Sequence, residues 1–334
     1  MRPVKVLITG GAGFIGSTIA SACLDRGVIP VILDNLATGC VEFATDRAFY
    51  EGDVTDGHVV DRIFRDHSDI ETVIHCAALS VVPDSVAQPL RYYQENVGKG
   101  IEFTGHLLRN GCHRLIFSSS ACVYGVGGSF TVDENSPIDP RSPYACSKSM
   151  MEKVMDDIAA VTPLRVLSLR YFNPIGADPK MRTGLPGGRT NSVLGAMISA
   201  SSDGTPFRIT GTDYPTRDGT AIRDYVHVWD LAQAHVNAVR RFPHLFTNGN
   251  HRLVVNLGTG KGTTVRELVD VFNEVARCHL HVVEANRRPG DLPGFYSRYE
   301  RARQLLGWRP ALSIADSVRD SLEWAYRSQS VFEQ

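Results

Sequence analysis

Short apolar runs alternate with longer amphipathic stretches through the first half of the chain. Five runs are apolar enough to be strands buried on both faces: residues 4–8, 29–35, 72–78, 114–117 and 164–169. A further short strand is expected just before Glu51. The stretches between the strands predict helices over 14–26, most of 83–110, and 142–160. Strands that alternate with helices predict an α/β fold with a parallel, doubly wound sheet.

The pattern changes in the second half of the chain. Glycine and proline concentrate in residues 176–190, which we expect to form a loop of the kind that often covers a binding site. A strand that ends at Asn256 and a helix over 264–277 follow. No clear linker separates the two halves. We therefore expect a sheet domain over about 1–175 and a smaller, interleaved α/β domain over about 176–334.

Glycines follow the first strand directly. Gly10, Gly13 and Gly16 allow a tight turn, a close approach of the backbone to a pyrophosphate, and close packing of the next helix on the sheet. Phe14 and Ile15 open that helix, whose N-terminus would face the phosphates. A glycine motif alone is weak evidence, but its place between a strand and an amphipathic helix predicts a dinucleotide-binding (Rossmann) domain.

The second strand ends in an acidic residue, Asp34, roughly 20 residues past the glycines. A carboxylate there accepts hydrogen bonds from the adenosine ribose and repels a 2′-phosphate, so the expected cofactor is NAD rather than NADP. Asn35 follows at the same site. The alternative is that Asp34 only shapes the turn at the end of the strand.

Further cofactor contacts are expected at the ends of the next two strands. Asp53 and Val54 are placed to meet the adenine, while Ala77 and Ala78 are small enough for the cofactor to pass close by. His75, just before the two alanines, is expected to be a packing residue rather than a base.

The candidate chemistry lies in a serine-rich strand end and the helix that follows it. Ser120 is expected near the C-terminal end of its strand, where open α/β sheets bind ligands. Ser142 and the proline after it form a good helix start, so Tyr144 and Lys148 would project from one helix face. A free tyrosine has a pKa of about 10, and a lysine one turn away would lower it, which makes the pair a general base for a sugar or alcohol hydroxyl. The Asn96 carboxamide would touch this centre or form a buried hydrogen bond between a helix and a strand.

Composition and charge exclude several classes of protein. Apolar residues make up 43% of the chain and charged residues 21%, and a net charge of -1 gives no reason to expect nucleic acid or an anionic membrane as partner. No apolar run reaches the ~18 residues of a membrane span, and no signal peptide is evident, so a cytoplasmic protein is expected. The seven cysteines are scattered without a CxxC pair, which favours buried thiols and no metal site.

Basic residues occupy loop positions in the second half of the chain. Arg223 is a candidate diphosphate clamp, because a guanidinium fork suits phosphate oxygens. Its alternative role is a salt bridge with the neighbouring Asp224. Arg288 lies in a second basic turn, 287–291, whose ordinary alternative is a solvated loop.

These motifs together resemble the extended short-chain dehydrogenase/reductase family, in particular its sugar-nucleotide 4-epimerases. The resemblance covers nearly the whole chain, and its most specific part is the run 211–225. It implies that NAD is bound, with Tyr144 as the base and Lys148 tuning it while holding the nicotinamide ribose. It also implies that Ser120 binds the 4-hydroxyl of the sugar.

The resemblance further implies a UDP-hexose substrate, UDP-glucose or UDP-galactose, whose C4 is inverted through a transient 4-keto intermediate. It adds Asn96 and Tyr171 to the cofactor contacts. It implies these contacts to the sugar nucleotide: Asn173, Asn191, Ser192, Arg223, Arg288 and Asp291. Phe295 would limit the room at C2 and favour hexoses without an N-acetyl group. A homodimer through the helices that begin near Pro83 and Tyr144 is implied as well.

Four residues depart from the pattern of these epimerases: Ser80, Cys122, Ser192 and Thr210. Ser80 stands where the family usually has a lysine near the cofactor, and Cys122 stands where it has a threonine. Ser192 replaces the second asparagine of a pair, and Thr210 replaces an aromatic residue that packs on uracil. The alternatives are a 4-epimerase of UDP-GlcNAc, UDP-glucuronate or a UDP-pentose, a 4-keto sugar-nucleotide reductase, and a non-catalytic dinucleotide sensor. Arg182 and Arg189 could bind a carboxylate, so a substrate with a carboxylated or otherwise modified sugar is a further alternative.

Overall fold

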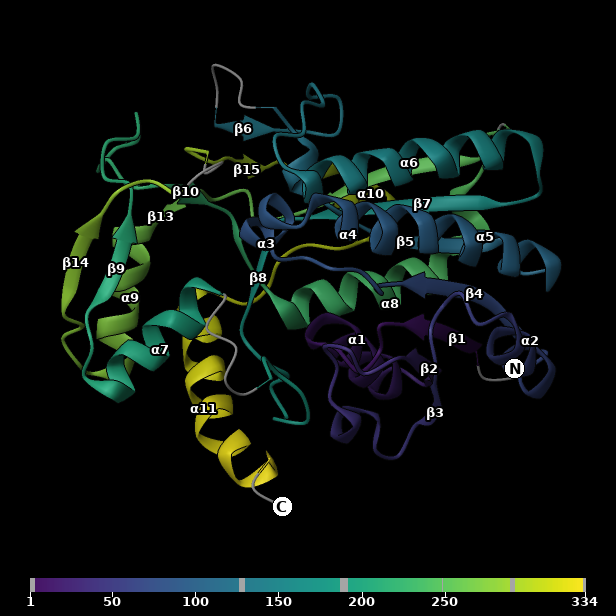
Figure 1. Cartoon of the computed structure of the whole chain (residues 1–334), viewed down its shortest axis with the longest axis horizontal. Coiled ribbons are helices and arrows are strands. Elements are labelled where there is room, and N and C mark those ends of the chain that lie inside the picture. Colours follow the sequence, from purple (N-terminus) through teal and green to yellow (C-terminus); the bar gives the residue numbers. More distant parts are fainter. Residues whose placement is uncertain (1–3, 126–129, 187–191, 248, 289–291, 333–334) are drawn as a thin grey trace.

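A parallel sheet of seven strands forms the centre of the molecule, in the order β12-β7-β5-β4-β1-β2-β3 (Figure 1). The structure is a computed structural model and describes residues 4–125, 130–186, 192–247, 249–288 and 292–332. The strands are β1 (Val4–Thr9), β2 (Val28–Asp34), β3 (Ala48–Glu51), β4 (Ile70–His75), β5 (Arg114–Ser120), β7 (Arg165–Tyr171) and β12 (Arg252–Leu257). Every neighbouring pair is parallel, so the predicted α/β fold with a parallel sheet is confirmed.

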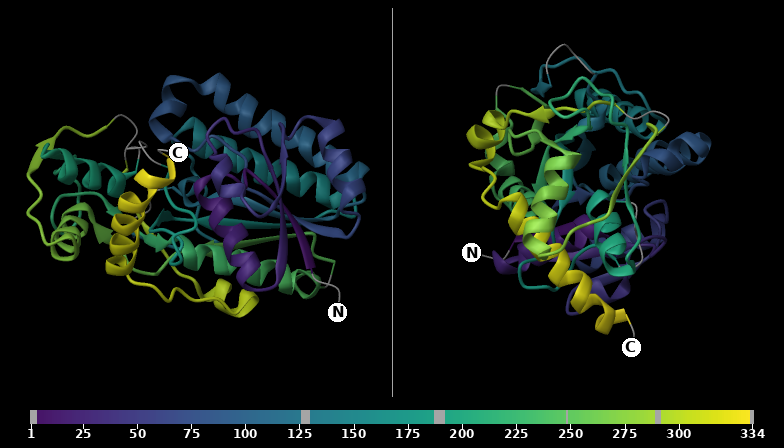
Figure 2. Two further views of the ribbon diagram at one scale, coloured as in Figure 1. Left: turned by 90° about the horizontal axis from the view of Figure 1, so that it is seen from below. Right: turned by 90° about the vertical axis from the view of Figure 1, so that its left-hand side faces the viewer.

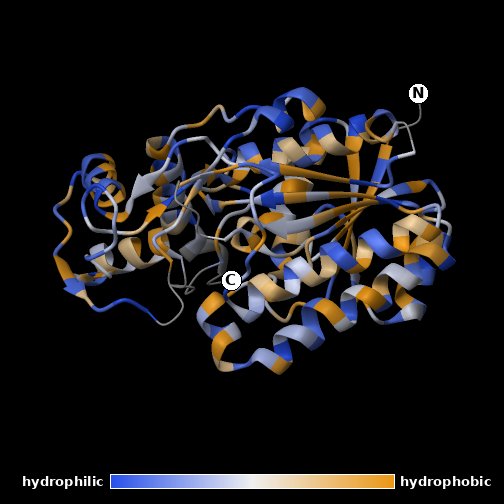
Figure 3. Cartoon of the chain, turned by 90° about the horizontal axis from the view of Figure 1, so that it is seen from above, coloured by the Kyte–Doolittle hydropathy of each residue, from blue (hydrophilic) through white to orange (hydrophobic). Residues whose placement is uncertain are grey.

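Helices cover both faces of this sheet (Figures 1 and 2). One face is covered by α1 (Phe14–Asp25), α8 (Val228–Leu245) and α10 (Glu300–Leu306), and the other by α2 (Gly57–Asp66), α5 (Lys99–Arg109) and α6 (Pro143–Val161). Two apolar cores result, one on each side of the strands. Figure 3 shows the strands coloured mainly as hydrophobic between helices of mixed colour, which is the doubly wound pattern that the sequence predicts.

The segment between β4 and β5 is helical, as predicted, but it is broken into pieces. It contains α3 (Val82–Ala87), α4 (Pro89–Tyr93), a π-helical turn over Gln94–Gly98, and α5. Such turns are rare and often occur at functional sites. The π-helical turn carries Asn96, one of the predicted contacts.

A third apolar core organises the C-terminal region, which extends to one side of the sheet (Figure 1). It joins α7 (Val193–Asp203), α9 (Val265–Ala276), α11 (Ile314–Phe332) and the parallel pair β9 (Phe207–Thr210) and β14 (Val282–Ala285). Three short strand pairs complete the fold: β8 (Asn173–Ile175) with β11 (Tyr225–His227), β10 (Ile222–Arg223) with β13 (Thr263–Thr264), and β6 (Thr131–Val132) with β15 (Tyr296–Ser297). Two short 3-10 turns lie at Val41–Ala44 and Ala121–Val123.

The two halves of the chain are intertwined at the sheet. Both β12 and α8 come from the second half, yet they belong to the large sheet and its helical cover. The predicted domain boundary near residue 175 stays a prediction. Within the described ranges, no helix combines the length and the apolar character that a membrane crossing requires.

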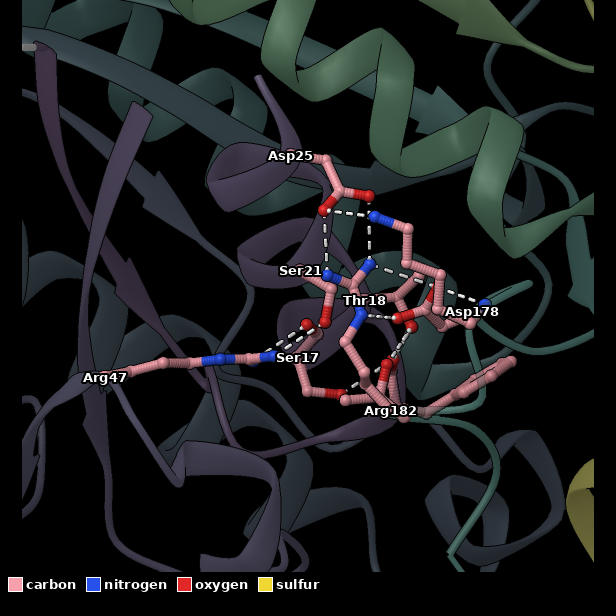
Figure 4. A network of polar contacts seen from close by, with 10 residues as sticks. Ser17, Thr18, Ser21, Asp25, Arg47, Asp178 and Arg182 are labelled. Atoms are coloured by element: carbon pink, nitrogen blue, oxygen red, sulfur yellow. Dashed lines mark hydrogen bonds and ion pairs between the residues drawn. The ribbon is translucent and has the colours of Figure 1, made fainter. Parts of the chain in front are cut away.

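A polar network fastens the loop after β8 to α1 (Figure 4). Arg182 forms ion pairs with Asp25 at 2.9 Å and with Asp178 at 2.5 Å. Its guanidinium is thus occupied at the junction of the two regions, which argues against its recognising a carboxylated sugar. Arg189, the other arginine considered for that role, lies outside the described residues.

Candidate active site

Ser120 and Tyr144 meet at the carboxyl edge of the sheet. Ser120 is the last residue of β5, and Tyr144 lies in the first turn of α6. This helix starts as predicted, because the Ser142 hydroxyl accepts the Ala145 N–H at 3.2 Å and Pro143 occupies the first position. Ser120 acts to lower the pKa of Tyr144, so the two side chains lie close together, and only 7% of Tyr144 is exposed. The hydroxyls of Ser120 and Tyr144 therefore come from separate elements and lie near each other at the end of β5.

The turn that follows β5 orients the Ser120 hydroxyl. Its oxygen accepts the N–H of Cys122 at 3.2 Å, in the 3-10 turn Ala121–Val123. This bond uses one of the two lone pairs of the oxygen and does not involve the Ser120 proton, which a neighbouring oxygen such as that of Tyr144 can accept. The Cys122 side chain itself is exposed beside the site.

Lys148 lies one turn further along α6 and is held by the main chain of β5. Its Nζ donates to the Ser118 carbonyl oxygen at 2.9 Å and lies 5.0 Å from the centre of the Phe117 ring. Burial lowers the pKa of Lys148 from 10.5 to about 8, while Cys76 and Glu152 act in the opposite direction. The ammonium is therefore buried but still largely protonated at neutral pH.

The expected acidification of Tyr144 by Lys148 is not found in this arrangement. Burial raises the pKa of Tyr144, the nearby Cys122 adds to the rise, and the hydrogen bond from Ser120 acts against it. Helical spacing places the two side chains on one face, but spacing alone does not show the desolvation of the phenol. A phenolate at this position therefore needs more positive charge than the protein's own residues supply.

The glycine turn between β1 and α1 fits a pyrophosphate. Gly10 has φ +66°, and a β-carbon there would lie 2.7 Å from the backbone that follows β4. A β-carbon at Gly16 would lie 2.2 Å from the Gly10 oxygen, whereas at Gly13 it would meet only one atom, at 3.4 Å. Within the described ranges no side chain caps α1, so the amides of its first turn, which includes Phe14 and Ile15, are available to an anion.

Asp34 both shapes the turn and keeps acceptor capacity for a ligand. Its two oxygens accept the N–H groups of Ala12 at 2.9 Å and Leu36 at 2.8 Å, so the alternative role as a turn residue is confirmed. An ionised carboxylate has about four acceptor positions, so about two remain for ribose hydroxyls. Asn35 donates to Asp53 at 2.9 Å, which links the ends of β2 and β3.

The site of Asp53 includes a lysine that the sequence analysis missed. Lys99, at the start of α5, donates to Asp53 at 2.7 Å and to Glu95 at 2.9 Å. Burial raises the pKa of Asp53, but the bonds from Lys99 and from Thr55 outweigh it and lower the pKa to about 2. Val54, its neighbour, is buried in the core and offers mainly its backbone to the site.

Two aromatic side chains back the site from the inside. The His75 ring is stacked on Phe103 at 5.0 Å and on Phe117 at 6.1 Å, and burial lowers its pKa to about 3. The expectation that His75 is a packing residue fits this neutral, buried ring. Tyr171, at the end of β7, packs against His235 at 6.2 Å, and burial raises its pKa while Ser118 acts to lower it.

The Asn96 carboxamide is buried, but its hydrogen bonds join it to the loop after β4 and to α6 rather than to a strand. Its carboxamide accepts the Leu79 N–H at 2.8 Å and donates to the Leu79 oxygen and the Ser147 hydroxyl, each at 3.0 Å. Ser147 in turn donates to the Tyr144 carbonyl at 2.7 Å. Asn96 therefore joins the half-buried segment of Ala77 and Ala78 to the catalytic helix rather than pointing into open space.

The alternative role of Arg223, a salt bridge with Asp224, is wrong. The Asp224 carboxylate accepts the backbone N–H groups of Thr259 at 2.8 Å and Ser297 at 3.1 Å. These bonds occupy the carboxylate, which does not pair with Arg223. Arg223 is half-buried, and its Nη1 donates to the Leu292 carbonyl at 3.2 Å. Within the described ranges no ion pair joins the two, so the guanidinium retains donors for a ligand.

The remaining predicted substrate contacts are spread over several loops. Phe295 packs edge-on against Tyr124 at 6.2 Å and Phe172 at 6.0 Å, close to the end of β5. Asn173 is exposed on β8, Ser192 caps α7 by accepting the Gly195 N–H at 2.9 Å, and Arg288 is exposed. Two further predicted residues lie outside the described ranges: Asn191 and Asp291.

A second missed residue is Glu152, four positions after Lys148 on α6. It is buried and pairs with Arg170, also buried, at 2.5 Å. The signal was present in the sequence, because a residue four positions after Lys148 lies on the same helix face.

Comparison with known proteins decides the family. The family described as the NAD dependent epimerase/dehydratase family matches residues 6–258. The chain belongs to this family. Among epimerase/dehydratase relatives, the UDP-glucose 4-epimerase of Azospirillum brasilense is 41% identical over 327 residues, covering 96% of this chain and 91% of its own. That of Bacillus subtilis (strain 168) is 37% identical over 332 residues, covering 96% of each.

Solved structures of the family share the fold closely. UDP-glucose 4-epimerase from Stenotrophomonas maltophila, with bound NAD and formylated UDP-arabinopyranose, matches with a TM-score of 0.92 at 32% identity over 98% of this chain and 99% of its own. The enzyme from Bifidobacterium longum, in complex with NAD+ and UDP, matches with a TM-score of 0.90 at 32% identity over the same shares. The resemblance to sugar-nucleotide 4-epimerases is therefore confirmed.

Proposed function

We propose that this chain is an NAD-dependent 4-epimerase that interconverts UDP-glucose and UDP-galactose. The observation that carries the proposal is the meeting of Ser120, Tyr144 and Lys148 at the sheet edge, beside a glycine turn that fits a pyrophosphate. Relatives named UDP-glucose 4-epimerase that cover nearly the whole chain support it. Asp34 at the end of β2 favours NAD over NADP.

The chemistry avoids a direct displacement at C4 of the hexose. Bound NAD supplies a hydride acceptor and carries a positive charge on its nicotinamide ring. Tyr144 takes the proton of the 4-hydroxyl as the ketone forms and returns it when the alcohol is restored. Ser120 hydrogen-bonds the same oxygen, and the Lys148 ammonium supplies positive charge one turn away. Both proton and hydride are returned, so the reaction is redox-neutral overall.

Inversion requires that the 4-keto sugar present its other face before the hydride returns. The diphosphate must then be held firmly and the hexose loosely. Arg223, with free donors on a half-buried guanidinium, supports the first requirement. Phe295, whose ring packs between Tyr124 and Phe172, supports a pocket that fits a hexose without an N-acetyl group.

We infer that the chain acts as a homodimer through α3, α4 and α6. Large apolar side chains are exposed on these helices: Val86 at 47%, Leu90 at 71% and Met150 at 48%. The three helices pack against one another, and exposed apolar side chains on neighbouring helices favour association. Leu90→Glu is expected to give a monomer in size-exclusion chromatography with light scattering. Lys153→Glu, an exposed change on α6, serves as control. Cytoplasmic location stays a prediction.

Incubation with a panel of sugar nucleotides and identification of the products tests the function. We expect UDP-galactose and UDP-glucose to interconvert without added NADH, and UDP-GlcNAc to react more slowly. If only UDP-GlcNAc, UDP-glucuronate or a UDP-pentose is turned over, that sugar nucleotide is the substrate instead of UDP-glucose and UDP-galactose. Consumption of one equivalent of NADH for each 4-keto sugar nucleotide reduced would indicate a reductase instead. Absence of turnover with every sugar nucleotide would indicate a dinucleotide sensor.

A further inference from the structure

The buried face of α6 carries a third ionisable residue in line with the catalytic pair. Glu152 follows Lys148 by one helical turn and Tyr144 by two, so the three share a face. Each reaches the serine run that ends β5. Tyr144 reaches the Ser120 hydroxyl, and Lys148 reaches the Ser118 carbonyl. The proposed chemistry uses these two contacts but leaves Glu152 without a role.

The Glu152 carboxylate is bound by three neighbouring strands. Ser119, the middle serine of the run on β5, donates to its Oε1 at 2.5 Å. Arg170 on β7 donates to Oε1 at 2.8 Å and to Oε2 at 2.5 Å. Arg252 on β12 donates to Oε2 at 3.2 Å. Since β5, β7 and β12 are adjacent in the sheet, one side chain of α6 is fixed to three strands.

The pair with Arg170 is a buried one. The side chains of Glu152 and Arg170 are each only 4% exposed. Burial works against the Arg170 cation, but its bonds with Glu152 outweigh that effect and raise its pKa. Arg170 also donates to the Tyr124 hydroxyl at 3.0 Å, which in turn donates to Asn256 at 2.6 Å. A bidentate, buried pair of this kind fixes geometry in a way that a surface salt bridge does not.

We propose that Glu152 is the positioning residue of the catalytic helix, holding Tyr144 and Lys148 at the correct place against the end of β5. The proposal rests on the proposed function and adds a residue that touches neither substrate nor cofactor. Glu152 also acts on Lys148 by charge. The ionisable groups that interact with that ammonium are His75, Cys76 and Glu152. Of these, Glu152 is the carboxylate, so it favours the protonated lysine.

The double variant Glu152→Leu with Arg170→Met tests this role. It removes both buried charges together, and Arg252, which also contacts Glu152, keeps its ion pair with Asp156, so no unpaired ion is left in the core. We expect kcat with UDP-galactose to fall on the order of 100-fold, as a misplacement of about 1 Å can cause, with KM within about twofold. The midpoint of the Lys148 titration, followed by NMR of 15N-labelled lysine side chains, is expected to move to lower pH. A role in stability alone would move neither quantity in the folded protein.

Asp157→Asn is the matched control. It removes a carboxylate from the same helix, but Asp157 is 63% exposed and pairs with Lys153 on the surface. We expect it to leave kcat and the Lys148 midpoint unchanged. Ser119→Ala, which removes only the anchor on β5, is expected to lower kcat with KM unchanged. It keeps the test decisive should the double variant not fold.

Folded variants that keep the wild-type kcat and Lys148 midpoint would overturn the role of Glu152. Wild-type protein that turns over no sugar nucleotide would instead overturn the proposed function, whatever the midpoint does. The two failures are therefore distinguishable.

Discussion

The proposed catalytic centre and the proposed substrate-binding region of this molecule are built in different ways. Ser120, Tyr144 and Lys148 stand on a central strand and a long helix, and their positions follow from sheet register, a helix cap and helical spacing. Arg223 and Phe295 stand on short strands and loops that are held by contacts between distant segments. The proposed chemistry is thus placed on a strand and a helix, and the proposed recognition of the substrate is placed mainly on loops and short strands.

Loss of the phenol hydroxyl is expected to have the largest effect. Tyr144→Phe should lower kcat on the order of 100-fold or more, since it removes the general base. The variant should still bind NAD, because the glycine turn and Asp34 are unchanged. Stopped assays with UDP-galactose measure kcat. Tyr326→Phe makes the same change at a residue that is 81% exposed and should be silent. A Tyr144→Phe enzyme that keeps most of its activity would show that Tyr144 is not the general base.

Loss of the predicted diphosphate clamp should affect binding rather than chemistry. Arg223→Met removes charge-assisted hydrogen bonds worth about 1.5–3 kcal/mol each, so KM should rise about 10- to 100-fold with kcat nearly unchanged. Arg217→Met is a suitable control, because Arg217 pairs with Glu267 on the surface. A fall in kcat with an unchanged KM would show that Arg223 acts on the chemical step rather than on binding, and would contradict the difference between the two regions.

Removal of the buried ammonium should change the pH dependence of stability. The pKa of Lys148 is about 8 in the folded protein and 10.5 ordinarily. Below pH 8 the charged, buried lysine costs stability, and this cost disappears as pH rises from about 8 to about 10.5. Lys148→Met should therefore be more stable than wild type at pH 7, by at most about 3 kcal/mol, at about 1.4 kcal/mol per pKa unit. Denaturant unfolding at pH 7 and pH 10 measures the difference, and a constant difference would contradict the shifted pKa.

The smallest effect is expected at the cofactor acid. Asp34→Asn keeps one oxygen for the turn but loses the negative charge, so NAD affinity should fall about 10-fold and the preference for NAD over NADP should narrow. Titration calorimetry with both cofactors on protein freed of bound nucleotide gives the ratio. Asp46→Asn, an exposed change in the following loop, is the control. An unchanged ratio of NAD affinity to NADP affinity would show that Asp34 only shapes the turn.

Local features allowed the sheet and the catalytic helix to be predicted. Strands buried on both faces are continuous apolar runs, and the cap at Ser142 needs only its neighbours in sequence. The contacts between distant segments could not be predicted in this way. Lys99 meets Asp53 from another helix, and Asp224 is bound by Thr259 and other residues of later loops rather than by its neighbour. Such pairings depend on the completed fold.

The pKa of Tyr144 shows a different kind of limit. Helical spacing indicated a nearby lysine, which lowers the pKa of a tyrosine, but burial raises it and the Lys148 ammonium is bound to the Ser118 carbonyl. Desolvation depends on everything that surrounds the phenol, and a sequence motif does not contain that information. We expect the bound, positively charged cofactor to supply the acidity that the mechanism needs.

Transfer of the C4 hydrogen as hydride, with Tyr144 handling only the hydroxyl proton, is the central claim. UDP-galactose that carries deuterium at C4, incubated with the enzyme in ordinary water and analysed by mass spectrometry, tests it most directly. The account predicts UDP-glucose that retains the deuterium at C4. Product that has lost its label to solvent would show that C4 is deprotonated instead, and would contradict the account.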